Sequence, residues 1–359
     1  MSSKRSHTTV LIVPTGIGAA IGGYAGDALP VARTLAQVSD RVITHPNVMN
    51  GAQMYWPMDN VHYVEGYGLD QFAAGHWGLR LVHQNAIGLV IDQAVEADLR
   101  SRHLQAADAA RATLGLNVAA HVITDQPLGV TLKTAASGAS WGTLENPGSL
   151  LRAAERLIVD AGVSAIAIIA RFPDDEGSAE LDAYRQGEGV DALAGAEAVI
   201  SHLVVRTFKL PCAHAPALAP IPLDPTISPK SAAEELGYTF LPCVLAGLSR
   251  APQFVMDPQI VAEPTIIRAD QVDAVVVPAT AFGGSAVMSL APRLNRTGGQ
   301  VIAVGENSTT MAVQAADLGI RAIAVNSYLE AAGAIAAYRA GVTPASLRPQ
   351  AHHIPALDP

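Results

Sequence analysis

The chain has 359 residues and a formal net charge of −9, and half of its residues are hydrophobic although only 5% are aromatic. Such an acidic chain offers no positive surface to a polyanion, so we expect no nucleic-acid partner. The core must consist mainly of aliphatic side chains, which is typical of parallel strands covered by helices.

The polar start of the chain leads directly into an apolar run, which is unlike a secretory signal. No uncharged apolar stretch approaches the length of a membrane span. Two cysteines cannot form a disulfide framework and favour a reducing compartment. We therefore expect a cytoplasmic protein with a small-molecule substrate and no membrane partner, while homo-oligomerisation stays open.

The first 45 residues are expected to form a βαβ unit. Residues 10–13 are typical of a buried strand that ends at Pro14. A glycine-rich stretch and a helical pattern follow, and they lead to a second strand at residues 42–44.

Strand and helix patterns then alternate along most of the chain. Further strands are predicted at residues 87–91, 118–123, 165–169, 274–277, 301–304 and 320–325, and helices at 94–114, 150–161, 285–290, 311–318 and 329–340. This alternation predicts an α/β fold with a mainly parallel sheet flanked by helices. We expect the N-terminal and C-terminal βα units to pack together.

The region from about residue 171 to 265 breaks this alternation. Prolines cluster between residues 211 and 229, and repeated proline excludes a helix or a central strand. We therefore expect an extended, proline-rich excursion there. The domains that we expect are an N-terminal α/β unit (1–130), a central region (131–265), a C-terminal α/β unit (266–345) and a tail (346–359).

A glycine-rich loop follows the first predicted strand. It contains Gly16, Gly18, Gly22 and Gly23, and backbone amides in such a loop can bind an anion where a helix begins. In a dinucleotide-binding fingerprint the third glycine would lie one position earlier in the loop. An acidic residue would stand at the end of the next strand, where this chain has His45. We expect the loop to contact the substrate and predict no cofactor, with a nicotinamide or nucleotide cofactor as the alternative.

Neutral polar side chains gather after the second strand. They are His45, Asn47, Asn50 and Gln53. Ligands of open α/β sheets bind beyond the carboxyl ends of the strands, which is where this loop would lie. A turn at Asn50 would explain the asparagines but not the histidine and the glutamine. We expect His45 to be catalytic and the three amides to bind a small polar substrate.

A second polar stretch, VEGYGLD, contains Glu65, Tyr67 and Asp70. A partly buried carboxylate in such a setting can act as a general acid or base. The alternative is a surface charge, with Asp70 capping a helix. We expect Glu65 to take part in catalysis and Tyr67 to bind substrate.

Polar residues also follow a predicted strand near the C-terminus, namely Glu306, Asn307 and Ser308. Since parallel strands end at one edge of a sheet, we expect these three to contribute to substrate binding. Ser308 is also a candidate helix cap.

The two cysteines supply the sharpest chemical signal. Cys212 lies two residues before His214 in PCAHAP, and Cys243 follows a proline in LPCVLAG. A thiol beside an imidazole can be held as the reactive thiolate. No C-x-x-C or H-E-x-x-H pattern completes a metal site, so no metal is predicted. We expect either cysteine to be nucleophile or acid–base group, with His214 or Glu65 as proton carrier, and buried, unreactive cysteines are the alternative.

Several longer segments resemble one family. These segments are PTGIGAAIGGYAGDA, HPNVMNGAQMYWP, VEGYGLD, GYTFLPCVLAGLSRAPQ and AVNSYLEAAGAI. They are similar to bacterial and cyanobacterial proteins described only as a domain of unknown function, from about residue 8 to 350. The resemblance implies no activity and no catalytic residue.

Taken together, the residues predict an enzyme that acts on a small polar metabolite without a redox cofactor. The first expectation is a hydrolase, or a related lyase or isomerase, that uses thiol, imidazole and carboxylate groups. The alternatives are a nicotinamide- or nucleotide-dependent oxidoreductase and a non-catalytic small-molecule-binding protein.

Overall fold

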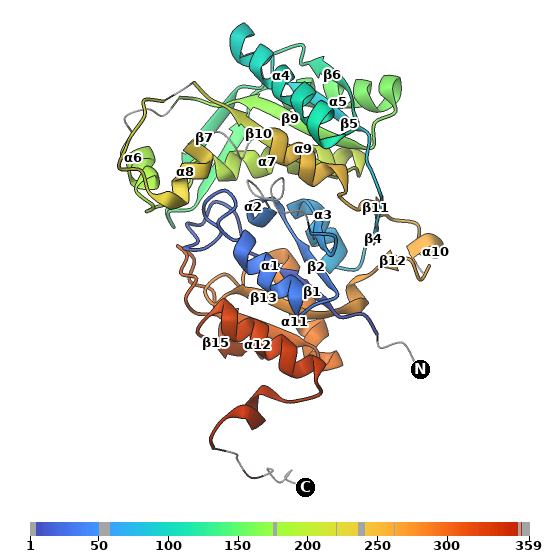
Figure 1. The fold of residues 1–359 in the computed structure, drawn as a ribbon, viewed down its shortest axis with the longest axis vertical. Helices are drawn as coiled ribbons and strands as arrows, with labels where there is room; N and C mark the ends of the chain where they lie inside the picture. The colour runs from blue at the N-terminus through green and yellow to red at the C-terminus, as the bar shows by residue number, and fades with distance from the viewer. Residues whose placement is uncertain are drawn as a thin grey trace.

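The computed structural model contains two parallel sheets with helices on their faces (Figure 1), which confirms the predicted α/β fold. The structure describes residues 5–49, 58–174, 178–219, 221–235, 241–261, 263–350 and 353. Within these ranges no helix is both long enough and apolar enough to cross a membrane.

The larger sheet joins the two ends of the chain. Its order is β15-β14-β13-β1-β2-β3, and every neighbouring pair is parallel. The strands are β1 (Thr8–Leu11), β2 (Arg41–Thr44), β3 (Val61–Tyr63), β13 (Val272–Pro278), β14 (Gln300–Val304) and β15 (Ile323–Val325). Because β1 pairs with β13, the N-terminal and C-terminal units form one body, as predicted.

Two pairs of helices cover this sheet. On one face lie α1 (Leu29–Gln37) and α12 (Tyr328–Arg339), and on the other lie α3 (Gly66–Ala73) and α11 (Ser285–Thr297). The strand β13 is buried along its whole length, which explains its aliphatic residues 274–277. Helix α11 passes Pro292 and ends at Gly298, whose φ of +78° closes the helix.

The smaller parallel sheet has the order β10-β9-β5-β6. Its strands are β5 (Ile87–Ile91), β6 (Val118–Ile123), β9 (Ala165–Arg171) and β10 (Cys212–Ala217), and its helices are α4 (Ala97–Leu114), α5 (Pro147–Ala161), α7 (Ala194–Phe208) and α9 (Leu241–Ser249). Helix α7 packs on β10 and also contacts α3 of the larger sheet. It therefore lies between the two sheets (Figure 1).

Short elements complete the described chain. They are the hairpin β7 (Val130–Thr134) and β8 (Ser140–Leu144), the antiparallel strands β4 (Gly78–Arg80), β11 (Gln253–Val255) and β12 (Ile266–Ile267), the helices α2 (Pro46–Met49), α6 (Ala179–Arg185), α8 (Pro229–Glu235) and α10 (Pro258–Val261), and the 3-10 turns η1 (Ala269–Gln271), η2 (Ala316–Leu318) and η3 (Pro344–Leu347).

Two local predictions are wrong. The proline-rich excursion begins with a strand, β10. Pro216 is tolerated in it because β10 lies at the edge of its sheet, where the missing N–H of proline costs no hydrogen bond to a neighbouring strand. The helix predicted at residues 311–318 is only the 3-10 turn η2, and Val313 instead bridges to Ala281. The domain boundaries stay a prediction, although sheet membership changes between β3 and β5 rather than at residue 130.

Candidate functional site

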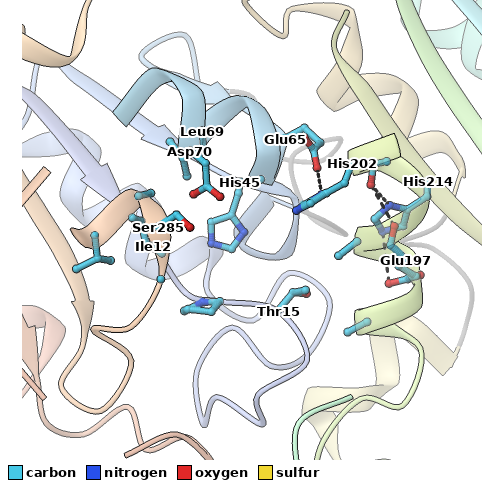
Figure 2. A pocket seen from close by; sticks show the side chains of 18 residues that line it. Ile12, Thr15, His45, Glu65, Leu69, Asp70, Glu197, His202, His214 and Ser285 are labelled. Atoms are coloured by element: carbon cyan, nitrogen blue, oxygen red, sulfur yellow. Dashed lines mark hydrogen bonds and ion pairs between the residues drawn. The ribbon is translucent and has the colours of Figure 1, made fainter. Parts of the chain in front are cut away.

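A cavity of about 230 Å³ lies where the carboxyl ends of β1, β2 and β3 face helix α7 (Figure 2). The larger sheet and its helices contribute Ile12, Pro14, Thr15, His45, Glu65, Gly66, Leu69, Asp70, Gly284, Ser285, Ala286 and Val287, and the smaller sheet contributes Ala194, Glu197, Ala198, Ser201, His202 and His214. The cavity is thus built from segments that are distant in sequence and meet at one rim of the larger sheet.

Glu65 links the two halves of this cavity. It follows β3 and caps α3, since its Oε2 accepts hydrogen bonds from the amides of Tyr67 (2.8 Å) and Gly68 (3.2 Å). Its Oε1 pairs with Nδ1 of His202 on α7. The Glu65 side chain is 1% exposed and that of His202 is 43% exposed. A buried carboxylate therefore orients an imidazole that reaches the cavity.

The surroundings of His202 favour its protonated form. Burial lowers the pKa of His202, but the hydrogen bond and charge of Glu65, together with the charge of Asp70, outweigh burial and raise the pKa above its ordinary value. The ring lies against the start of α3, where a Cβ on Gly66 would come within 2.8 Å of Cε1 of His202. Glycine at position 66 is thus needed for this arrangement.

Asp70 faces the N-terminus of α11 from the first turns of α3 (Figure 2). Burial is the main cause that raises the pKa of its carboxyl, and the charge of Glu65 acts in the same direction. The charge of His202 and hydrogen bonds from Ala286 and Ser285 oppose this rise only in part. Asp70 consequently keeps its proton to a higher pH than an ordinary aspartate does.

His45 lies at the end of β2 and is 7% exposed. Its Nε2 accepts a hydrogen bond of 2.9 Å from the amide of Val13. Burial lowers the pKa of His45 to about 4, so the ring is neutral at pH 7.

A second polar group on the cavity wall consists of Glu197, Ser201 and His214. The Oγ of Ser201 lies 2.8 Å from Nδ1 of His214, and Nε2 of His214 lies 3.4 Å from Oε2 of Glu197. Glu197 and Ser201 are one turn apart on α7 and so share a face. The group fixes the orientation of the His214 ring.

The structure brings three of the five expected catalytic residues together, namely His45, Glu65 and His214. Cys212 and Cys243 do not line this cavity. Burial, and after it the charge of Glu65, raises the pKa of the Cys212 thiol well above its ordinary value, which disfavours a reactive thiolate. Cys243 is 3% exposed in the apolar helix α9.

The glycine loop packs against other parts of the chain. A Cβ on Gly16 would lie 2.6 Å from Oγ of Ser140, and one on Gly18 would lie 2.9 Å from Val190. Gly22 and Gly23 are similarly enclosed, by Val13 and by the carbonyl of Ala19. The four glycines are therefore absent from the cavity lining and allow close packing instead.

Asn307 fastens this loop. Its Oδ1 accepts from the amide of Ile21 (2.9 Å), and its Nδ2 donates to the carbonyl of Ile21 and the hydroxyl of Tyr328, both at 2.8 Å. The carbonyl of Ser308 accepts a further amide hydrogen bond from the loop, and Glu306 accepts one from Tyr328. These three residues hold loop and helix rather than line the cavity.

The remaining expected binding residues are placed as follows. Asn50 and Gln53 lie outside the described residues, and so does the side chain of Asn47. Tyr67 packs edge-on against Trp77, with ring centroids 5.8 Å apart, and is not part of the lining.

Sequence reasoning missed the contribution of α7. Glu197, Ser201 and His202 stand out as polar residues in the otherwise apolar segment AGAEAVISHLVV, and the spacing of four places the first two on one face. That signal was available from the sequence. Among the described residues, no three His, Cys, Asp or Glu side chains are grouped so as to hold a metal ion.

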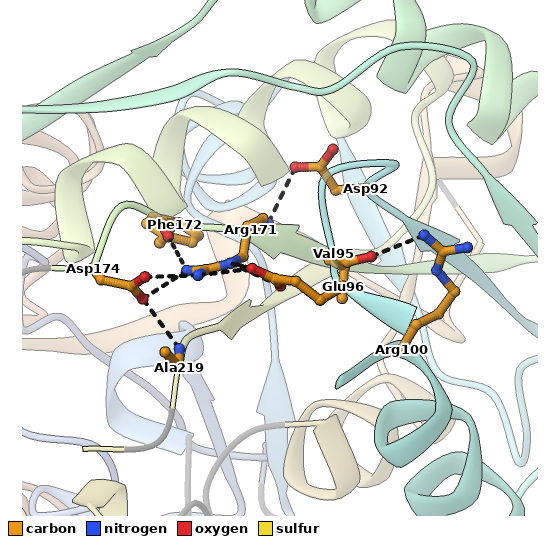
Figure 3. A network of polar contacts seen from close by, with 8 residues as sticks. All are labelled: Asp92, Val95, Glu96, Arg100, Arg171, Phe172, Asp174 and Ala219. Atoms are coloured by element: carbon orange, nitrogen blue, oxygen red, sulfur yellow. Dashed lines mark hydrogen bonds and ion pairs between the residues drawn. The ribbon is translucent and has the colours of Figure 1, made fainter. Parts of the chain in front are cut away.

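Another polar cluster lies at the carboxyl ends of β5 and β9 (Figure 3). Arg171 pairs with Asp174 at 2.7 Å and with Glu96 at 3.0 Å. The buried carboxyl of Asp92 accepts from the amides of Arg171 (3.1 Å) and Leu128 (3.0 Å). Because these groups are hydrogen-bonded or paired with one another, the cluster connects the ends of the two strands and has a structural role.

Comparisons with known proteins agree with the resemblance found in the sequence. The family model described as "Protein of unknown function (DUF3326)" matches residues 8–348. A protein of Synechococcus sp., named an uncharacterized lipoprotein, is 61% identical over 345 residues, which cover 96% of this chain and 94% of that protein. No solved structure matches. The resemblance to a family of unknown function is thus confirmed.

The name of that relative contradicts part of what the sequence led us to expect. A protein named a lipoprotein is not described as a cytoplasmic hydrolase. The expectations of a cytoplasmic location and of no membrane partner are therefore corrected.

Proposed function

The chain belongs to the DUF3326 family of proteins of unknown function, and on that premise we propose that it is an enzyme that moves protons on a small polar metabolite bound in the cavity. One observation carries the proposal: the buried Glu65 orients His202, from the opposite half of the molecule, at the cavity wall. A carboxylate that orients an imidazole is a recurrent way to build a general base.

The proposed roles follow from the surroundings of each group. Neutral His202 accepts a proton through Nε2, since Nδ1 is paired with Glu65, and the same carboxylate stabilises the imidazolium that forms. Asp70, whose pKa is raised by burial, supplies a proton from the other side of the cavity. Hydrolysis, elimination and isomerisation all need one group that takes a proton and one that gives it.

The size of the cavity supports a small substrate. Its volume of about 230 Å³ is below the roughly 300–1,000 Å³ of pockets that bind drug-sized ligands. The proposal uses no thiol, because Cys212 is fully buried outside the lining.

Isotope transfer from solvent tests this proposal and does not require that the substrate be identified first. The protein is incubated with the small-molecule fraction of a bacterial extract, once in ²H₂O and once in H₂¹⁸O, and metabolites are followed by mass spectrometry. We expect at least one metabolite to gain label. Deuterium would indicate isomerisation or elimination, and ¹⁸O would indicate hydrolysis.

Variants make the result specific to the cavity. We expect His202→Asn and Glu65→Gln to lose the labelling. His76→Asn is the matched control, because His76 is an exposed histidine outside the lining. Labelling that is absent with the unaltered protein, or that survives in His202→Asn, would contradict the proposal.

A further inference from the structure

One edge of the His45 ring is used by the backbone, and this fixes its tautomer. The amide of Val13 can only donate, so Nε2 of His45, at 2.9 Å from it, must present a lone pair. In a neutral imidazole the single proton is then on Nδ1. The buried position of the ring keeps it neutral. His45 is thus a hydrogen-bond donor at Nδ1.

That donor has no partner within the described part of the chain. No described group bonds to Nδ1 of His45. The polar atoms that lack a partner and are fully enclosed do not include this nitrogen, so it is open to the cavity. His45 itself lies in the cavity lining, and its ring is in the middle of the site in Figure 2. A ligand in the cavity is therefore the natural acceptor for this N–H.

The charges of the lining restrict what that ligand can be. No lysine or arginine lies among the lining residues that the structure describes, whereas three carboxyl groups do: Glu65, Asp70 and Glu197. The N-terminus of α11, which would attract an anion, already faces Asp70. His202, the lining imidazole whose pKa is raised, is already paired with Glu65. An anionic substrate would therefore meet the other carboxyls without an unpaired lysine or arginine among the described lining residues to balance them. A cationic group, in turn, offers no lone pair to the N–H of His45.

We propose that the cavity takes a small uncharged metabolite that bears a carbonyl oxygen, and that Nδ1–H of His45 donates a hydrogen bond to this oxygen. The catalytic part of this inference, namely that the hydrogen bond from His45 assists proton removal, rests on the proposed function. A donor fixed at a carbonyl oxygen stabilises the negative charge that gathers there when a neighbouring group loses a proton to the base.

The tautomer is tested by NMR of the full chain labelled with [¹⁵N]histidine. We expect the His45 signals, assigned by their loss in His45→Gln, to show a protonated Nδ1 and an unprotonated Nε2 throughout pH 5–8. A protonated Nε2 in that range, either as the other tautomer or as the imidazolium, would overturn the inference.

Ligand recognition is tested with three probes of the same shape: acetamide, acetate and acetamidinium. We expect acetamide to shift the Nδ1–H resonance of His45 in a saturable way, and the anion and cation to bind more weakly. In His45→Gln, which keeps an acceptor for Val13, we expect acetamide affinity, followed at the Gly66 amide, to fall roughly threefold to tenfold. Binding of acetate or acetamidinium as tight as that of acetamide, or no shift with acetamide, would refute the inference.

The two proposals can fail separately. Acetamide bound at His45 without isotope labelling of any metabolite would support the recognition and refute the catalysis. Labelling that depends on His202, with no response of His45 to acetamide, would support the catalysis and refute the recognition.

Discussion

Replacement of Glu65 perturbs the contact that joins the two halves of the cavity. Glu65→Ala removes the cap that accepts from the amides of Tyr67 and Gly68, a loss of about 0.5–2 kcal/mol. It also removes the pair with His202, which contributes at most about 1 kcal/mol because His202 is 43% exposed. We expect the free energy of unfolding to fall by roughly 0.5–3 kcal/mol in total.

Glu65→Gln separates the two contributions. The amide oxygen of glutamine still accepts from the α3 amides, so we expect a loss of no more than about 1 kcal/mol. Urea denaturation of both variants, and of each combined with His202→Asn, measures the coupling between the two side chains. If Glu65→Ala costs less than about 0.5 kcal/mol, as surface substitutions do, or if the effects of Glu65→Gln and His202→Asn simply add, the reasoning is refuted.

Three further predictions concern single positions. Burial raises the pKa of Asp27 from 3.8 to about 6, so its stabilising contribution is complete below pH 4 and is lost as the pH rises through 6. Asp27→Asn should therefore remove this pH dependence and raise stability at pH 8 by up to about 3 kcal/mol, seen as a higher Tm; an equal or lower Tm at pH 8 would contradict it. Gly66→Ala should displace the His202 ring and shift its pKa, followed by NMR titration, toward the ordinary value, and an unchanged titration would show that the ring is not held there. Asn307→Ala removes three hydrogen bonds of a buried side chain and should lower the free energy of unfolding by roughly 2–4 kcal/mol while leaving the titration of His202 unaltered; a loss below 1 kcal/mol would count against its role in fastening the loop.

Most strands of both sheets, though not β3 and β10, could be predicted because their local signal is strong. Runs such as residues 87–91 and 118–123 are strands with the expected bounds. Their sheet membership could not be predicted, since it depends on which distant strands pair. The same holds for β10, where proline excludes a central strand and only tertiary pairing shows that the position is an edge.

The site was predictable where chemistry coincides with a strand end. His45 follows β2 directly and lines the cavity. Glu65 also lines the cavity, but it was expected as a carboxylate between tyrosines and glycines, since β3 was not predicted. The partner of Glu65 could not be found in the same way, because His202 lies in a helix of the other sheet and the pair exists only through packing. Burial of the two cysteines is likewise a tertiary property, since Cys212 beside His214 has the same sequence whether its thiol is enclosed or open.

The cavity between β1, β2, β3 and α7 is central to both proposals, because small molecules are expected to bind there. NMR of the ¹⁵N-labelled chain, with the small-molecule fraction of a bacterial extract added, maps the affected amides directly. We predict shifts at Gly66, Ala198 and Ser285, which line the cavity, and none of comparable size at residues 16–26. Shifts confined to the glycine loop, or scattered without reference to the cavity, would contradict the account.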